Sequence, residues 1–322
     1  MSRSLRRRLL FLILLFFTGL YWTYLKYKSL LQQKRMNIIS NDIEDVDAYP
    51  LDIRYIPAPI QEKYHEIFPQ DDWKYLALLK EMLQEEEVSR GIEFEDDFLR
   101  LYLICNNYKI DRAFSMILNC LHLRKNHDYL FRNISFDFTQ NPAYKFISVL
   151  PQRRKDGSVT VVFKVAKWNP DEVPFEHLKL IMFMIPMQQL RNPVTQASGF
   201  NLIYDFAEAG IRYMRYGTPQ NVYLFHHVSF EVLPMRFLGY HLVNVNFIGN
   251  FLVSLIRPFL PKDIEKVFYT HSSLKELLDY FPKSMLPVEY GGSLEDYYTD
   301  DWLRKANKEH GNFPAGGLKN IF

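Results

Sequence analysis

The side chains that most often carry chemistry in proteins are few in this chain and poorly spaced for it. His226 and His227 are adjacent, so on a helix they point in different directions and form no one-face pair of metal ligands. His122 and His127 are five residues apart, which is also poor ligand spacing. The sequence holds no glycine-rich phosphate loop, no Gly-x-Ser-x-Gly turn and no His-Glu-x-x-His motif. We therefore predict no catalytic residue, no metal site and no cofactor, and interpret these histidines as packed or surface residues.

The composition indicates an aromatic interior. The 322 residues include 26 Phe and 21 Tyr, more than an ordinary core needs, so a cavity with aromatic walls and a core without a cavity are both open readings. Cys105 and Cys120 each lie among Leu and Ile, which indicates buried free thiols and a reducing compartment rather than a disulfide framework. The formal net charge of +2 argues against nucleic acid as a main partner.

Residues 1–28 combine a basic start with an apolar run. Residues 9–25 carry no charge, aromatic side chains crowd their C-terminal end, and Lys26 and Lys28 close the run. This pattern reaches the lower length limit of a membrane-spanning helix and predicts a single uncleaved membrane anchor, with a signal peptide and an interfacial helix as alternatives. Basic residues flank both ends, so the positive-inside rule gives no clear orientation. A glycosylation sequon at Asn133 matters only if the folded domain is luminal.

The chain after the anchor divides into a linker, two folded regions and a tail. Residues 29–70 are polar, contain four prolines and read as a linker. Residues 71–135 show helical spacing and predict a small helical bundle, and residues 301–322 form a C-terminal tail. In residues 136–300, strands and helices alternate. Strands are expected at 159–165, 199–206 and 237–245, and helices at 174–190, 219–230 and 247–257. We therefore predict an α/β domain with a mixed, largely parallel sheet.

The segment 247–257 has two interpretations. Phe247, Phe251 and Leu255 belong to one broad apolar face, and the segment has no charge before Arg257. A core helix explains this pattern, and so does a lid over an apolar cavity that dips into a membrane.

Four stretches of the α/β region share a distinctive order and spacing. They are Lys155-Asp156-Gly157 leading through a strand to Lys167-Trp168-Asn169-Pro170, then Asn201 to Asp205, then Pro234 to Asn244 running into Ile256 to Leu260, and finally Leu286 to Gly292. In these motifs the chain resembles the CRAL-TRIO family of lipid-binding proteins, most closely its tocopherol- and retinaldehyde-carrier branch. The resemblance covers residues 70 to 300.

The resemblance implies an apolar pocket with the sheet as its floor and the helix at 247–257 as a mobile gate. The implied pocket residues are Tyr204, Phe225, Val228, Ser229, Leu233, Met235, Phe237 and Tyr240, and the gate residues are Phe247, Phe251 and Leu255. The family's tocopherol carrier has two serines on the helix that matches 175–190, whereas residues 181–186 here have no hydroxyl group. This departure indicates a less polar or differently anchored ligand.

The resemblance also raises phosphoinositide binding. Arg236 matches one headgroup position, three others are replaced, and Arg257, Lys262 and Lys266 lie nearby in sequence and could form a weaker basic patch. Two functions follow as hypotheses. One is a carrier that binds a tocopherol-, retinoid- or phospholipid-like molecule and transfers it between membranes. The other is a membrane-anchored adaptor that senses a lipid and binds a protein partner. The resemblance favours a domain on the cytosolic side, and neither hypothesis requires an enzyme.

Overall fold

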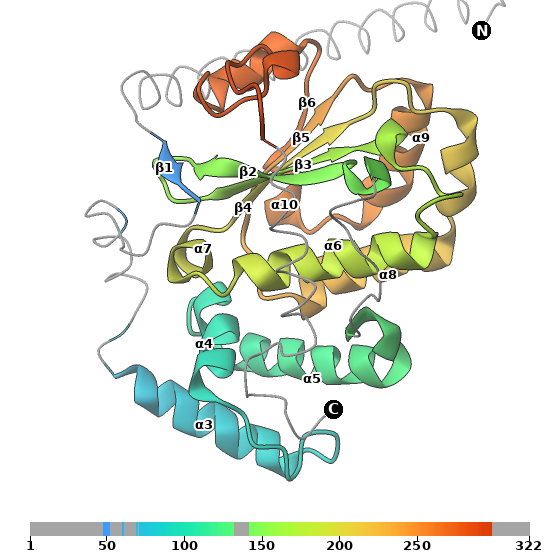
Figure 1. Cartoon of the computed structure of the whole chain (residues 1–322). Coiled ribbons are helices and arrows are strands. Elements are labelled where there is room, and N and C mark those ends of the chain that lie inside the picture. The colour runs from blue at the N-terminus through green and yellow to red at the C-terminus, as the bar shows by residue number, and fades with distance from the viewer. Residues whose placement is uncertain (1–47, 52–59, 61–68, 70, 132–141, 298–322) are drawn as a thin grey trace, which may run out of the picture.

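The computed structural model describes residues 48–51, 60, 69, 71–131 and 142–297 (Figure 1). Three helices form one layer, and a six-stranded sheet with its own helices forms the larger part. The predicted mixed, largely parallel α/β fold is confirmed.

The prediction of a transmembrane helix, and of a localisation set by it, is corrected. Within the described ranges no helix is both long and apolar enough to cross a bilayer. The longest of them, α5 (Ile110–Asn126), has 17 residues and carries charges near both ends. Residues 9–25, on which the prediction rested, lie outside the described residues, as does the sequon at Asn133.

The first layer contains α3 (Asp72–Glu85), α4 (Asp96–Cys105) and α5. In α3, Leu76, Leu79 and Leu83 are buried at the spacing of one helix face, which packs on the other two helices. Between α4 and α5 the chain turns through two residues with left-handed backbone angles, so the two helices contact each other after a short connection.

The sheet follows the chain order from edge to edge. Its strands are β1 (Tyr49–Pro50), β2 (Ile147–Arg153), β3 (Val159–Lys164), β4 (Phe200–Asp205), β5 (Phe237–Val243) and β6 (Phe268–Thr270). β2 pairs with β3 antiparallel, and β3 to β6 are parallel to one another. The connections contain α6 (Phe175–Gln189), α7 (Pro193–Ser198), α8 (Pro219–His226), α9 (Phe247–Ile256) and α10 (Lys262–Glu265).

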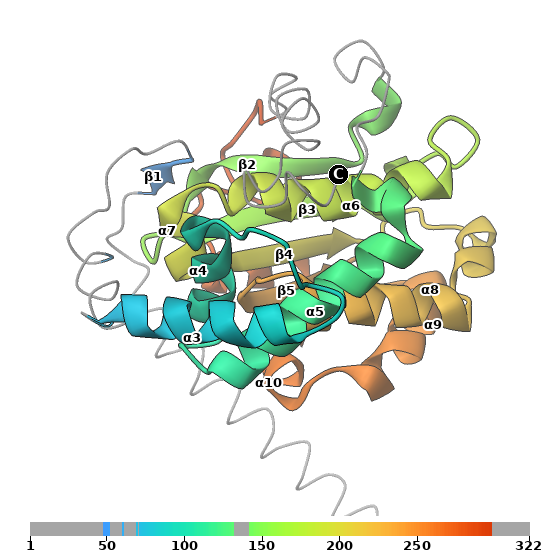
Figure 2. The ribbon, with the colours of Figure 1, turned by 90° about the horizontal axis from the view of Figure 1, so that it is seen from below.

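Because the parallel strands follow one another in order and crossovers are right-handed, the crossover helices gather on one face of the sheet. Figure 1 shows α6 and α8 on that face, and Figure 2 shows α9 beside α8, with which it is in contact. The opposite face is covered by the segment after β6. There Leu277, Phe281 and Leu286 pack on Val162 and Ile203 of the central strands.

The elements that were predicted match the observed ones to within a few residues. The strands β1, β2 and β6 and the short helices α7 and α10 were not predicted. The helix expected at 219–230 ends its α-helical part at His226 and continues as one turn of π-helix, His227–Val232.

Candidate functional site

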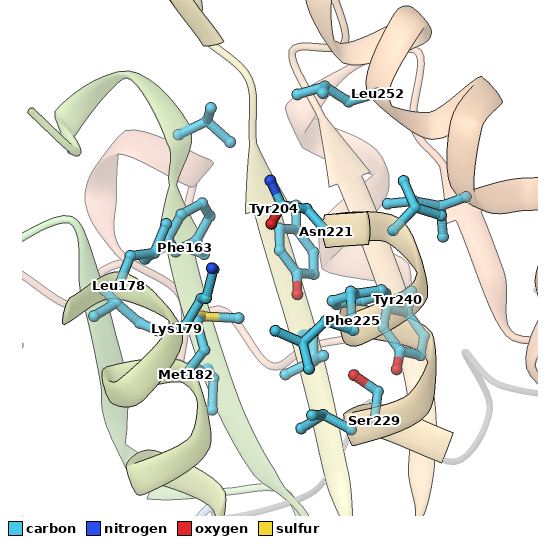
Figure 3. Close-up of a pocket in the computed structure, with 18 of the residues that line it drawn as sticks. Phe163, Leu178, Lys179, Met182, Tyr204, Asn221, Phe225, Ser229, Tyr240 and Leu252 are labelled. Carbon is cyan, nitrogen blue, oxygen red and sulfur yellow. The ribbon is translucent and has the colours of Figure 1, made fainter. Parts of the chain in front are cut away.

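A cavity of about 330 Å³ lies between the sheet and the helices α6, α8 and α9 (Figure 3). Its walls are almost entirely aliphatic and aromatic. All eight residues implied as pocket residues line it: Tyr204, Phe225, Val228, Ser229, Leu233, Met235, Phe237 and Tyr240. A volume of this size lies at the lower end of the range for small-molecule sites.

The floor of the cavity follows from the alternation of side chains along the strands. On β4, Leu202 and Tyr204 line the cavity, whereas Ile203 between them points to the opposite core and is 0% exposed. Leu202 and Tyr204 are only half-buried although they belong to a central strand. Their exposed surface lies in the cavity, which distinguishes this face of the sheet from a packed core.

A bulge in β5 adds a second aromatic residue to the floor. Phe237 pairs with Phe200 and Gly239 pairs with Asn201, so one extra residue of β5 lies between two successive pairs. Strict alternation would send Phe237 and Tyr240 to opposite faces. The extra residue places both rings in the cavity wall, 4.9 Å apart between centroids.

The π-helical turn after α8 forms a side wall. Phe225 of α8 and Val228 and Ser229 of the π-helical turn line the cavity. A π-helix spaces its hydrogen bonds one residue further apart than an α-helix and is enriched at functional sites. The same turn also contains Glu231, whose carboxylate oxygens lie 3.6 Å from Nδ1 of His226 and 2.7 Å from Nδ1 of His227. The two adjacent histidines thus contact the two oxygens of one carboxylate, and the expectation that they form no pair of metal ligands stays a prediction.

Few polar groups reach the cavity. Among the lining residues, Tyr204, Tyr213, Tyr216, Ser229 and Tyr240 carry hydroxyls, Asn221 carries an amide, and Lys179 of α6 is the charged residue (Figure 3). Burial raises the pKa of Tyr204 and of Tyr240 well above that of a free phenol, so both hydroxyls keep their protons. No group of three or more His, Cys, Asp or Glu side chains in the described part of the chain could hold a metal ion.

The helix α9 closes one side of the cavity with its C-terminal half. Leu252, Leu255 and Ile256 line the cavity, while Phe247 is 74% exposed and Phe251 is half-buried outside the lining. Of the three expected gate residues, therefore, Leu255 alone faces the cavity.

The N-terminal end of α9 is held in place. The side chain of Asn246 accepts a hydrogen bond from the Gly249 amide and donates to the carbonyls of Phe206 and Ala209. Gly249 lies directly on Phe206, where an added Cβ would come within 2.8 Å of the ring. The end of α9 next to Asn246 is thus fixed, and the end next to Arg257 has fewer buried residues.

The cations expected at a headgroup site do not share one environment. Arg236 is partly buried and donates to the Ile104 carbonyl at 2.6 Å and to the Asn107 side chain, so it joins β5 to the first helical layer. Desolvation lowers its pKa. Arg257, Lys262 and Lys266 are exposed beyond α9, with Lys266 3.3 Å from Asp263. The structure thus separates Arg236, which is engaged within the fold, from three exposed cations.

Comparisons with known proteins agree with this architecture. Residues 144–292 match the model of the CRAL/TRIO domain. The human protein named alpha-tocopherol transfer protein-like is 24% identical over 241 residues, 74% of this chain and 70% of that protein. Rat clavesin-1 is 25% identical over 217 residues, 65% of this chain and 60% of that protein. The crystal structure of Sfh5 aligns with a TM-score of 0.52 at 12% identity, over 79% of this chain and 98% of that one, which shows a shared fold.

The matched residues run from the start of β2 to the end of the segment that covers the back of the sheet, and they therefore include every strand that forms the cavity floor. The motifs found in the sequence lie in the same range. The resemblance to the CRAL-TRIO family is therefore confirmed for residues 144–292, and the relatives named for tocopherol transfer and as clavesins are consistent with the tocopherol- and retinaldehyde-carrier branch.

Proposed function

We propose that this protein binds one lipophilic molecule in the cavity and exchanges it with membranes by movement of α9. The observation that carries the proposal is the cavity itself, a space of about 330 Å³ between the sheet and its helices whose walls are almost entirely apolar. Such a surface is unfavourable in contact with water and becomes favourable when an apolar ligand covers it. Relatives named for tocopherol transfer support the same class of function.

The exchange route in this proposal passes α9. This helix has no charged residue, its exposed side carries Phe247, and Phe259 just beyond it is 60% exposed. Arg257, Lys262 and Lys266 lie on the adjacent exposed segment. Apolar side chains next to cations suit a surface of anionic lipids, phosphoinositides included, because headgroup attraction needs several close positive charges. We propose these three cations, rather than Arg236, as the headgroup contacts.

A cavity-filling variant tests the proposal. Val228→Trp places a large side chain inside the cavity, and Tyr223→Trp adds the same ring at a neighbouring position that is 65% exposed and outside the lining. Organic extracts of the purified proteins are analysed by mass spectrometry, and uptake of a fluorescent lipophile from vesicles is measured. We expect Val228→Trp to lose cargo and uptake while Tyr223→Trp keeps both. Cargo retained in a folded Val228→Trp protein would place the ligand elsewhere and refute the proposal.

A further inference from the structure

The turn after α8 is a π-helix, and this winding determines which side chains form the side wall of the cavity. Phe225, Val228 and Ser229 line the cavity. The next lining residue of the segment is Leu233, whereas Val232 lies outside the lining and is 0% exposed. The amide of Leu233 donates to the carbonyl of Val228, five residues earlier, at 3.0 Å, which is the hydrogen bond of a π-helix. In an α-helix the donor would be Val232, and Val232 would then face the cavity in place of Leu233.

The carboxylate of Glu231 lies outside the cavity lining and contacts the two histidines at the start of the turn. Nδ1 of His227, four residues earlier, is 2.7 Å from one oxygen, and Nδ1 of His226, five residues earlier, is 3.6 Å from the other. Side chains four residues apart are neighbours on an α-helix, whereas a contact at a spacing of five suits the wider turn of a π-helix. Tightening the turn to an α-helix would therefore separate Glu231 from His226.

The backbone of Glu231 is held from the first helical layer. The π-helical turn ends at Val232, and Pro234 just beyond it has no backbone N–H to offer. The carbonyl of Glu231 accepts a hydrogen bond from the side chain of Asn119 on α5 at 3.2 Å. Both the side chain and the carbonyl of Glu231 thus have partners that depend on where this residue lies in the turn.

The ring of Phe230 connects the histidines to the cavity floor. Its centroid is 5.3 Å from that of His226 and 5.8 Å from that of Phe237 on β5. Phe237 lines the cavity at the bulge in β5. A change in the winding of the turn would move Phe230 and would disturb this part of the floor as well as the side wall.

Taking the proposed function as given, we propose that Glu231 is a positioning residue that holds the side wall in its π-helical register, with Leu233 towards the ligand. Its contacts with the two histidines and with Asn119 stabilise this register over the α-helical one, in which Val232 replaces Leu233. Glu231 then determines the shape of the cavity without touching the ligand. Through Asn119, the first helical layer acts on the same wall.

An exchange of roles between two neighbouring residues tests the inference. The probe is diphenylhexatriene, an uncharged hydrocarbon whose fluorescence rises in apolar surroundings, and its Kd is measured with the full chain. In the unmodified protein, Leu233→Ala should weaken probe binding about fourfold, the contribution of one buried methylene group, and Val232→Ala should have the smaller effect. In the Glu231→Ala protein the order should reverse, with Val232→Ala the more damaging change. A loss of stability alone would not reverse it, because the reversal is a coupling between specific residues.

Matched variants separate positioning from a general loss of stability. Glu231→Gln keeps an oxygen that accepts from Nδ1 of His227, and it should retain most of the probe affinity that Glu231→Ala loses. Asn119→Ala removes the contact to the carbonyl and should act in the same direction as Glu231→Ala. Glu81→Ala removes an exposed carboxylate from α3 and should leave probe binding unchanged. Urea denaturation of every variant confirms that it is folded.

The outcomes distinguish the role of Glu231 from the proposed function. If Leu233→Ala and Val232→Ala have the same effects in the Glu231→Ala protein as in the unmodified one, the inference is overturned and the function stands. Equal losses of affinity in Glu231→Gln and Glu231→Ala would also overturn it, because the hydrogen bond to His227 would then not hold the turn. If Glu231→Ala does not fold, the exchange of roles is measured in Asn119→Ala, and its absence there has the same meaning. Failure of the probe to bind the unmodified protein would count against the proposed function itself.

Discussion

Two neighbouring residues of β4 allow the cavity to be tested by stability alone. Leu202 faces the cavity and is half-buried, whereas Ile203 faces the opposite core and is 0% exposed. Each substitution to Ala removes three carbon atoms, which corresponds to about 2.4 kcal/mol of transfer free energy when the side chain is fully buried. The two sites differ in what surrounds those atoms, and the difference sets the expected cost.

At Ile203 the loss opens a new void in a packed core. The transfer and cavity contributions together give a cost of about 3–5 kcal/mol. At Leu202 the substitution only enlarges an existing cavity of about 330 Å³ and removes a side chain that is not fully buried. We expect Leu202→Ala to lower the free energy of unfolding of the ligand-free protein by about 1–2 kcal/mol.

The stability gained on ligand binding should also differ between the two variants, and Ile203→Ala, which costs more without ligand, should gain more with it. A ligand at about 100 times its Kd adds about 2.7 kcal/mol to the stability of the protein that binds it. Ile203→Ala keeps the cavity wall and should gain this full amount, whereas Leu202→Ala has lost ligand contacts and should gain about 1 kcal/mol less. The assay is urea denaturation of both variants, stripped of lipid and reloaded with a fluorescent lipophile. Equal costs in the stripped proteins, or equal gains on loading, would refute the reasoning that this face of the sheet is a ligand surface.

Two further predictions concern α9 and the back of the sheet. Phe251→Asp should keep the fold but slow transfer of a fluorescent lipophile between vesicles several-fold, because a charge opposes entry into the bilayer interface; unchanged transfer in the folded variant would exclude α9 as the gate. Behind the sheet, His241 and His271 are 3.0 Å apart, and burial lowers the pKa of both. The pKa of each histidine in the folded protein lies below the unfolded value of about 6.5, so the folded state favours the neutral form. The contribution of the pair to the free energy of unfolding is fully present above about pH 6.5 and is lost as the pH falls below that value. The loss is at most about 1.4 kcal/mol per pH unit for each histidine. Urea midpoints between about pH 7.5 and pH 5.5 measure this slope, which His271→Gln should reduce; an unchanged slope would show that other groups dominate.

Local sequence patterns predicted most of the strands and helices that form the cavity. The β-branched run at 159–165 and the buried run at 199–206 predict β3 and β4 because strand propensity and burial act within a few neighbouring residues. The bounds of α6 and α9 were likewise predicted to within one residue at each end, since helical periodicity and proline positions mark them. The eight pocket residues came from motif resemblance, and periodicity alone would have missed one of the two rings on β5.

What the sequence by itself determined is the order of strands and helices, the apolar character of the 247–257 helix, and a set of residues that ends up around one cavity. The tertiary structure decided the rest. The β5 bulge exists only in the pairing of β5 with β4, where one extra residue brings Phe237 and Tyr240 onto one face. Arg236 became a link to α4 because a carbonyl 132 residues away in the chain lies within hydrogen-bond distance. Side-chain periodicity is a property of neighbours in sequence, whereas register, long-range hydrogen bonds and an unfilled space exist only once distant segments are packed together.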